Sequence, residues 1–343
     1  MTITLRTEAL NKTYRRKIRK PGFVGALKGL FSGEEEAVQA VSDVTFSLAR
    51  GERVGLIGEN GAGKSTTLKM LTGILVPTSG KLEVLGFDPS RQRRQLASRI
   101  GVVFGQRPQL LWDIPVQETL SLLRTMYRIP ASVYDVTYPQ AVERLDLGPL
   151  LAVPVRKLSL GQRMRCDLAA SLLHAPDIAF LDEPTIGLDV SVKEQVREFI
   201  RDMQQRFEST LLLTTHDLKD ITETCDRILL LDRGKLLFDG SLREFERRFA
   251  TKRRIVVELE RPASDEVREQ LAKDIAELGA ELVECRAHRA VVVYEGDGAA
   301  PALTQRLLSR LPVSDIVLEK SDIDSMVANI YRRSTISTEK SVA

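Results

Sequence analysis

The chain has 343 residues, of which 43% are hydrophobic and 28% are charged, which suits a globular protein of about two domains and excludes general disorder. Its formal net charge of +3 is mild, so the composition implies no nucleic-acid partner. No uninterrupted apolar run approaches the roughly 18 residues that cross a bilayer, and we therefore expect the chain to be soluble by itself.

Alternating strands and helices are predicted along the first part of the chain, and this alternation favours an α/β sheet. Strands are expected at 3–10, 41–48, 52–57, 177–181, 210–215, 227–231 and 235–239. Helices are expected from about 63 and near 116–127, 136–146 and 162–173. We assign residues 1–248 to one domain, with a basic insertion at 15–36 and a helical subdomain at about 107–175.

The pattern restarts after residue 249. Strands are predicted at 253–260, 281–286, 290–294 and 313–319, with helices at 264–278 and 301–311. The order β-α-β-β-α-β predicts a small α+β accessory domain of ferredoxin-like type over 249–331. Residues 332–343 are expected to form a flexible tail.

The strongest chemical signal is the segment GENGAGKST at 58–66, which fits the pattern G-x-x-x-x-G-K-[ST] between a predicted strand and a predicted helix. Its glycines let backbone N–H groups converge on phosphate oxygens at the helix N-terminus. Lys64 would neutralise the β- and γ-phosphates, and the Ser65 hydroxyl would ligate Mg²⁺. We therefore predict a site for a nucleoside triphosphate, formed by Gly58, Asn60, Gly61, Ala62, Gly63, Lys64, Ser65 and Thr66.

A second chemical signal is the segment IAFLDEPT at 178–185. Its apolar run predicts a buried parallel strand that delivers two acidic residues to the carboxyl edge of the sheet. Asp182 is placed to hold Mg²⁺ through water. Glu183 is placed to orient and deprotonate the water that attacks the γ-phosphate.

Three further stretches, GVVFGQ, LSLGQ and LLLTTHD, occur together with GENGAGKST, LDEPT and IGLD. Over roughly residues 3–245, this order resembles the nucleotide-binding subunits of ABC transporters. The resemblance implies a P-loop NTPase core of ABC type with ATP and Mg²⁺ as cofactors. It implies that Gln106 contacts Mg²⁺ and the lytic water, that His216 contacts the γ-phosphate, and that Asp189 links two active sites. Tyr14, expected just after the first strand, resembles the family's adenine-stacking residue.

The segment LSLGQ at 158–162 resembles the family's signature loop, which faces the nucleotide of a second subunit. Ser159, Gly161 and a helix N-terminus beginning near Gln162 would then cap the partner's γ-phosphate. The usual pattern has glycine where this chain has Leu160, so a positive φ is not expected there. A second ATPase subunit, forming a homodimer, is thus an expected partner.

Residues 12–20 carry six basic side chains, and Phe23, Leu27, Leu30 and Phe31 would share one helical face. The segment is either a solvated surface excursion or an amphipathic element, over residues 12–31, that touches an anionic membrane surface or a membrane subunit. Its position and the stretch FGQRPQLLWDIPV, which contains Trp112, resemble ATPases of ABC-2 exporters.

We predict an ATPase that lies peripherally on the cytoplasmic face of the inner membrane and drives separate membrane-spanning permease subunits, in the direction of export. A polysaccharide-type ABC exporter is the alternative. A soluble ABC ATPase acting on ribosomes or DNA is disfavoured by the single uninterrupted cassette. The absence of a guanine-reading N-K-x-D motif disfavours a GTPase. For the accessory domain the hypothesis is a regulatory or dimer-supporting role.

Overall fold

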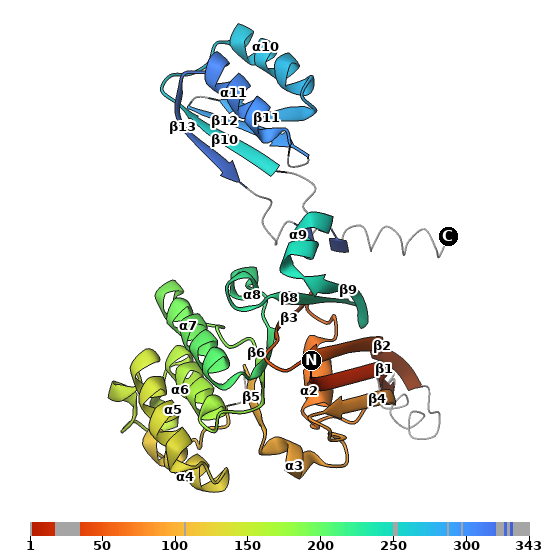
Figure 1. The fold of residues 1–343 in the computed structure, drawn as a ribbon, viewed down its shortest axis with the longest axis vertical. Coiled ribbons are helices and arrows are strands. Elements are labelled where there is room, and N and C mark those ends of the chain that lie inside the picture. The colour runs from red at the N-terminus through yellow and green to blue at the C-terminus, as the bar shows by residue number, and fades with distance from the viewer. Residues whose placement is uncertain are drawn as a thin grey trace, which may run out of the picture. The chain divides into compact units, whose positions relative to one another are not determined.

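The computed structural model describes residues 2–17, 35–105, 108–249, 253–286, 288–295, 298–319, 326–327 and 330–331 (Figure 1). Most of the predicted insertion and the whole of the predicted tail lie outside these residues. The chain divides into two compact units, Met1–Leu242 and Arg243–Ala343. This division falls a few residues before the expected boundary after 248, which stays a prediction.

A six-stranded sheet with the order β5-β6-β7-β3-β8-β9 forms the centre of the first unit. Its strands are β3 (Arg53–Gly58), β5 (Ile100–Phe104), β6 (Ile178–Asp182), β7 (Thr210–Thr214), β8 (Arg227–Asp232) and β9 (Lys235–Ser241). All neighbouring pairs are parallel except β8 and β9. The parallel strands are short apolar runs, as a sheet covered on both faces requires. Their carboxyl ends meet at one edge of the sheet.

A second, antiparallel sheet has the order β2-β1-β4, with β1 at Ile3–Lys17, β2 at Glu35–Ala49 and β4 at Ser79–Val84. The first two strands are much longer than expected, since their pairing continues to Lys17 and Glu35. The prediction that Tyr14 follows the first strand is therefore wrong, because it lies within β1 and pairs with Val38. The polar sequence hid this extension, since a backbone ladder needs no apolar side chains.

The helices of the first unit are α2 (Lys64–Leu71), α3 (Arg93–Ala97), α4 (Val116–Met126), α5 (Ala131–Arg144), α6 (Leu160–Leu172), α7 (Val190–Phe207) and α8 (Leu218–Thr224). Figure 1 shows α4, α5 and α6 grouped on one side of α2, with the antiparallel sheet on the other. β4, α3 and β5 were not predicted from the sequence, and α5 begins several residues before its expected start at 136.

The second unit begins within α9 (Leu242–Phe249) and continues as β10 (Arg253–Leu259), α10 (Asp265–Ala276), β11 (Ala280–Arg286), β12 (Arg289–Tyr294), α11 (Ala300–Arg310) and β13 (Val313–Glu319). Its strands form one antiparallel sheet in the order β11-β12-β10-β13. Alternate residues of β10, namely Ile255, Val257 and Leu259, are buried in a core shared with Leu271 and Leu307. The predicted ferredoxin-like order of elements is confirmed.

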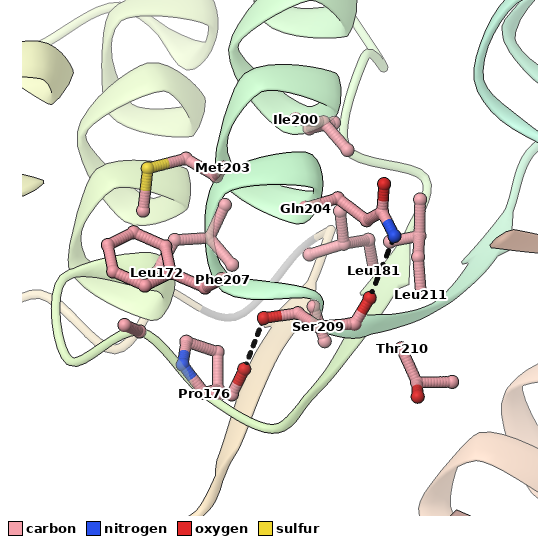
Figure 2. A pocket seen from close by; sticks show the side chains of 12 residues that line it. Leu172, Pro176, Leu181, Ile200, Met203, Gln204, Phe207, Ser209, Thr210 and Leu211 are labelled. Atoms are coloured by element: carbon pink, nitrogen blue, oxygen red, sulfur yellow. Dashed lines mark hydrogen bonds between the residues drawn. The ribbon is translucent and has the colours of Figure 1, made fainter. Parts of the chain in front are cut away.

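A small void lies among α6, α7, β6 and β7, and Figure 2 shows the mostly apolar side chains around it. It encloses about 10 Å³, which is enough for about one water molecule at most. Ser209 Oγ donates a hydrogen bond to the Pro176 carbonyl at 2.5 Å, and Gln204 Nε2 donates to the Ser209 carbonyl at 3.1 Å (Figure 2). This void is a packing feature and not a ligand site. Among the described residues, no helix is both long enough and apolar enough to span a bilayer.

Candidate functional site

The P-loop, residues 58–66, connects β3 to α2 through a turn that requires glycine. Gly63 has φ of 106°, and a Cβ there would stand 2.6 Å from the carbonyl oxygen of Ala40 in β2. A Cβ on Gly58 would stand 2.7 Å from the carbonyl oxygen of Leu231 in β8. Both side chains must therefore be absent for the loop to lie this close to its neighbouring strands.

The P-loop presents backbone donors that the protein itself does not use. Within the described part of the chain, six amide N–H groups of this loop and the first turn of α2 donate to no acceptor: those of Asn60, Gly61, Gly63, Lys64, Ser65 and Thr66. The first turn of any helix leaves such donors, and together they form a site for an anion.

Lys64 extends into this loop and is buried. Its Nζ donates hydrogen bonds to the carbonyl oxygens of Gly58 at 2.5 Å and Glu59 at 3.1 Å. Burial lowers the pKa of this ammonium group, and the carboxylates of Glu183 and Asp182 oppose that effect. The motif cation and the two motif carboxylates are thus brought into one electrostatic environment.

Asp182 ends β6 in register with Thr214, the last residue of β7. The Thr214 hydroxyl donates to Asp182 Oδ1 at 2.5 Å, while Oδ2 has no hydrogen-bond partner among the described residues. Sequence analysis did not single out Thr214, because its role depends on this strand pairing. The N–H of Gly105, directly before Gln106, donates to the Asp182 carbonyl at 3.1 Å. Gln106 itself lies outside the described residues.

Glu183 follows β6 in an unusual backbone conformation. It has φ of 53°, and its N–H donates to the Thr214 carbonyl at 2.8 Å. Positive φ is uncommon for a residue other than glycine, and such strain concentrates at functional sites. His216 comes after β7, and its Nδ1 lies 3.5 Å from Glu183 Oε1. The His216 side chain is 63% exposed, so it is open to a ligand.

No group of three or more His, Cys, Asp and Glu side chains is arranged to hold a metal within the described ranges. The donors that suit Mg²⁺ here are oxygens. Oδ2 of Asp182 and the hydroxyl of Ser65 are both without hydrogen-bond partners in the part of the chain that the structure describes. Mg²⁺ commonly uses one or two carboxylates and completes its ligand set with phosphate and water oxygens, so these residues fit it.

Tyr14 lies on β1 opposite Val38, with its ring 40% exposed. Lys12 Nζ stands 5.5 Å from the ring centroid. The strand opposite, β2, passes the P-loop at Ala40, two residues beyond Val38. The β1–β2 pairing therefore places Tyr14 near the P-loop, although the predicted insertion separates the two in sequence.

The signature loop, residues 158–162, precedes α6. Ser159 is the N-cap, and its Oγ accepts from the Gln162 N–H at 3.2 Å, while Gln162 Oε1 accepts from the Ser159 N–H at 2.9 Å. This capping box starts the helix at Leu160, two residues earlier than expected. The φ of Leu160 is not positive. This agrees with the expectation for a leucine at this position.

The signature loop packs against the segment that follows LDEPT. A Cβ on Gly187 would stand 2.8 Å from Leu160 Cδ2, and one on Gly161 would stand 3.0 Å from Leu188 Cδ2. Asp189, the next residue, is exposed at the N-cap of α7 and its side chain makes no capping hydrogen bond. The structure therefore brings the signature loop and Asp189 together. In the described part of the chain, no hydrogen bond or ion pair joins the signature loop to the P-loop.

Comparison with known proteins agrees with this geometry. A family model described as ABC transporter matches residues 41–186. The ABC transporter ATP-binding protein NatA of Bacillus subtilis (strain 168) is 32% identical over 212 residues, which cover 62% of this chain and 86% of NatA. Nod factor export ATP-binding protein I of Ralstonia nicotianae (strain ATCC BAA-1114 / GMI1000) is 35% identical over 212 residues, but the match spans only 64% of that protein and 62% of this chain.

The fold has a solved counterpart as well. A structure described as the ATP binding subunit of an ABC transporter has a TM-score of 0.60 at 25% identity, and the match covers 72% of this chain and 93% of that one. Sequence and fold thus identify the same family. The chain belongs to the ABC transporter ATP-binding proteins and is an ATPase.

Proposed function

We propose that this chain is the peripheral subunit of an ABC exporter, in which two copies bind and hydrolyse ATP to drive separate membrane-spanning subunits. One observation carries the catalytic part of the proposal. The buried ammonium of Lys64, the carboxylates of Asp182 and Glu183, and the ring of His216 gather at the carboxyl edge of the sheet, next to a helix N-terminus with free N–H groups.

In this proposal the P-loop holds the phosphates of ATP. The six free N–H groups of the P-loop donate to phosphate oxygens, and Lys64 turns from its two carbonyl partners toward the β- and γ-phosphates. Tyr14 stacks on the adenine ring. Its half-exposed ring on the strand ladder beside the P-loop supports this role.

Glu183 is the general base in the proposed reaction. Its carboxylate takes a proton from the attacking water, and His216 contacts the γ-phosphate beside it. The separation of 3.5 Å between His216 Nδ1 and Glu183 Oε1 supports a shared task. Gln106 would contact the lytic water. The hydrogen bond from Gly105 to Asp182 supports this assignment, because it fixes the chain next to Gln106.

Bound Mg²⁺ would neutralise charge on the β- and γ-phosphates. Ser65 would hold it through its hydroxyl and Asp182 through water, with Gln106 nearby. Thr214 leaves Oδ2 of Asp182 free by donating to Oδ1, which fixes the carboxylate for this purpose.

The signature loop would complete the ATP site of a second copy. Ser159 Oγ accepts from Gln162 N–H but keeps its own proton for donation, and the N–H of Gly161 is also free among the described residues. These two donors, at the N-terminus of α6, suit the γ-phosphate held by a partner chain. The exposed Asp189 would link the two sites. A homodimer would place these donors at the ATP site of an identical chain.

The direction of export rests on resemblance and on a named relative, the Nod factor export protein. A polysaccharide-type exporter is the alternative, and a soluble ABC ATPase is less well supported. Leu111 and Trp112, in the stretch that resembles ABC-2 exporters, are 45% and 48% exposed, as a contact with a membrane subunit requires. Residues 12–31 would touch an anionic membrane surface at the cytoplasmic face of the membrane.

The catalytic proposal is tested by Glu183→Gln. ATP binding should persist, hydrolysis should fall by roughly 10²- to 10⁴-fold because the base is lost, and an ATP-held dimer should accumulate. Glu198→Gln, at an exposed carboxylate of α7, is the matched control and should turn over normally. Near-normal turnover of Glu183→Gln would rule out its role as the base. Co-purification from membranes should recover the permease subunits, and their absence would count against the transport role.

A further inference from the structure

Asp220, on α8, is a buried carboxylate that none of the family motifs includes, and it touches both loops that carry the proposed catalytic groups. Its side chain is 1% exposed. Asp220 Oδ2 accepts hydrogen bonds from the Thr185 hydroxyl at 2.5 Å and from the Thr215 hydroxyl at 3.0 Å. One oxygen atom therefore holds two segments that lie 30 residues apart in the sequence.

Both hydroxyls are close to the reacting groups along the chain. Thr185 comes two residues after Glu183, in the turn closed by the Ile186 N–H donating to the Glu183 carbonyl at 3.2 Å. Thr215 comes directly before His216. Because each threonine is buried, neither can reach nucleotide itself. Their common effect is to fix the spacing between Glu183 and His216.

Arg197, on α7, supports the carboxylate from the other side. Its Nη1 stands 3.3 Å from Asp220 Oδ1, and its other nitrogens pair with Glu223 at 3.0 Å and Glu194 at 3.2 Å. Burying a lone carboxylate is costly, and a guanidinium partner together with two hydroxyl donors offsets that cost. The charge at Asp220 is thereby fixed in place, and the two loops are held against α7.

A parallel contact holds the same loop just beyond His216. Lys193 Nζ, one turn before Arg197 on α7, donates to Asp217 Oδ2 at 2.6 Å, and the Asp217 N–H donates to the Thr215 hydroxyl at 3.0 Å. On one side of His216, Asp217 is held by α7 directly, and on the other side Thr215 is linked to α7 through Asp220 and Arg197.

We infer that Asp220 is a positioning residue for ATP hydrolysis, which holds Glu183 and His216 at their working separation through the hydroxyls of Thr185 and Thr215. This inference rests on the catalytic roles proposed above for Glu183 and His216. Misplacement of a catalytic group by about 1 Å can cost on the order of 100-fold in rate, so a clamp of this kind acts on turnover more than on binding.

The test replaces each hydroxyl with a methyl group of similar size in the full-length protein. In Thr215→Val and Thr185→Val, kcat should fall roughly 10- to 100-fold, while the Kd for ATP should stay within about three-fold because the P-loop is untouched. Thr215→Ser and Thr185→Ser restore the hydroxyl and should recover most of the lost kcat. Thr222→Val, which removes an exposed hydroxyl from α8, the helix that carries Asp220, is the control and should behave as the parent.

Each variant is first checked by its melting temperature, and the two loops give independent variants if one fails to fold. Parental kcat in folded Thr215→Val and Thr185→Val would overturn the inference. Serine variants as slow as the valine variants would overturn it too, because packing and not the hydrogen bond would then be responsible.

A double variant separates this inference from the function on which it rests. If Thr215 acts through the reacting groups, adding Thr215→Val to Glu183→Gln should reduce the residual rate much less than Thr215→Val alone reduces the parental rate. If Thr215→Val reduces the rate of Glu183→Gln by the same factor as it reduces the parental rate, Thr215 does not act by positioning Glu183. If Glu183→Gln is inactive while the valine variants turn over normally, only the clamp is wrong. If Glu183→Gln itself turns over normally, the catalytic proposal fails, and the clamp fails with it.

Discussion

The P-loop and the signature loop use the same ingredients, namely glycine, serine and a helix N-terminus, but they leave different groups free. In the P-loop, six N–H groups have no acceptor among the described residues, and Lys64 lies within the turn. In the signature loop, Ser159 and Gln162 satisfy each other through the capping box. The P-loop therefore has a set of donors that an anion could bind. In the signature loop the capping box is complete, and only the Ser159 hydroxyl and the Gly161 N–H remain as free donors among the described residues.

The glycines of the two loops differ in a related way. Gly63 needs positive φ and lies against the Ala40 carbonyl, so its turn is fixed by a neighbouring strand. Gly161 has ordinary φ, and its nearest neighbour is the flexible end of Leu188. The P-loop is therefore preorganised by its own chain. In the proposed dimer, the close approach at Gly161 would come from the nucleotide of the partner chain.

Ser159→Arg should disable the signature loop and leave the P-loop intact. The bulky cation would occupy the position where the partner's γ-phosphate docks, so the closed dimer should not form and hydrolysis should fall by at least about 100-fold. ATP binding by each monomer should be nearly unchanged, because the P-loop is intact. Steady-state hydrolysis and nucleotide affinity measure the two effects. Hydrolysis at the parental rate by a monomer would refute the two-chain site.

Mixing Ser159→Arg chains with Lys64→Ala chains gives the matched experiment. Both defects then fall in one composite site, and the other site is whole. With Glu183→Gln added to both chains, each mixed dimer should trap one ATP, as measured by nucleotide retention after gel filtration. No retention in the mixture would contradict the trans arrangement.

Alanine substitutions at Gly63 and Gly161 compare the two glycines directly. Gly63→Ala should lower ATP affinity by roughly ten-fold and the melting temperature by about 2–8 °C, since alanine at positive φ costs about 1–2 kcal/mol and meets the Ala40 carbonyl. Gly161→Ala should leave both quantities nearly unchanged, because only Leu188 must shift. Isothermal titration and thermal melting give the two readouts. Equal losses of affinity in both variants would show that the loops are not built differently.

Asp167 lies on α6, the helix that begins at the signature loop, and contrasts with Lys64 in how its charge is treated. For Lys64, two carboxylates oppose the lowering of the pKa by burial. Asp167 forms no ion pair with any residue that the structure describes, and burial raises its pKa to about 7 despite hydrogen bonds from the N–H groups of Gln109 and Leu110. Between the ordinary pKa of 3.8 and about 7, the folded state keeps a proton that the unfolded state has released. This group therefore costs stability as the pH rises through that window.

Asp167→Asn removes that titration. The melting temperature of the variant minus that of the parent should increase by roughly 5–10 °C between about pH 5 and pH 8, because the two pH units below a folded-state pKa of about 7 correspond to about 3 kcal/mol. Thermal melting across this range measures it. Asp202→Asn, at a partly exposed carboxylate of α7, should show a smaller change. A difference that stays flat with pH would mean that Asp167 is ionised in the folded protein throughout.

The features of this protein that depend on local backbone chemistry could be predicted from its amino-acid sequence. The P-loop, the acidic pair after β6 and the signature loop before α6 were all located by short motifs, because each needs particular residue types at fixed spacing. The capping box that starts α6 at Leu160 was not predicted. The ferredoxin-like order of the second unit also followed from alternating apolar residues. In contrast, the full lengths of β1 and β2 were missed, since polar ladders carry no hydrophobic period.

Contacts between groups that are distant in the chain could not be predicted, because they depend on how the elements pack. The pairing of Asp182 with Thr214 depends on the register of β6 and β7, and register between strands far apart in the chain is not written in either strand. The convergence of Thr185 and Thr215 on Asp220 depends in the same way on how α7 and α8 pack on the sheet. Motifs specify the groups that react, whereas their separations are set by the packing of segments that no motif contains.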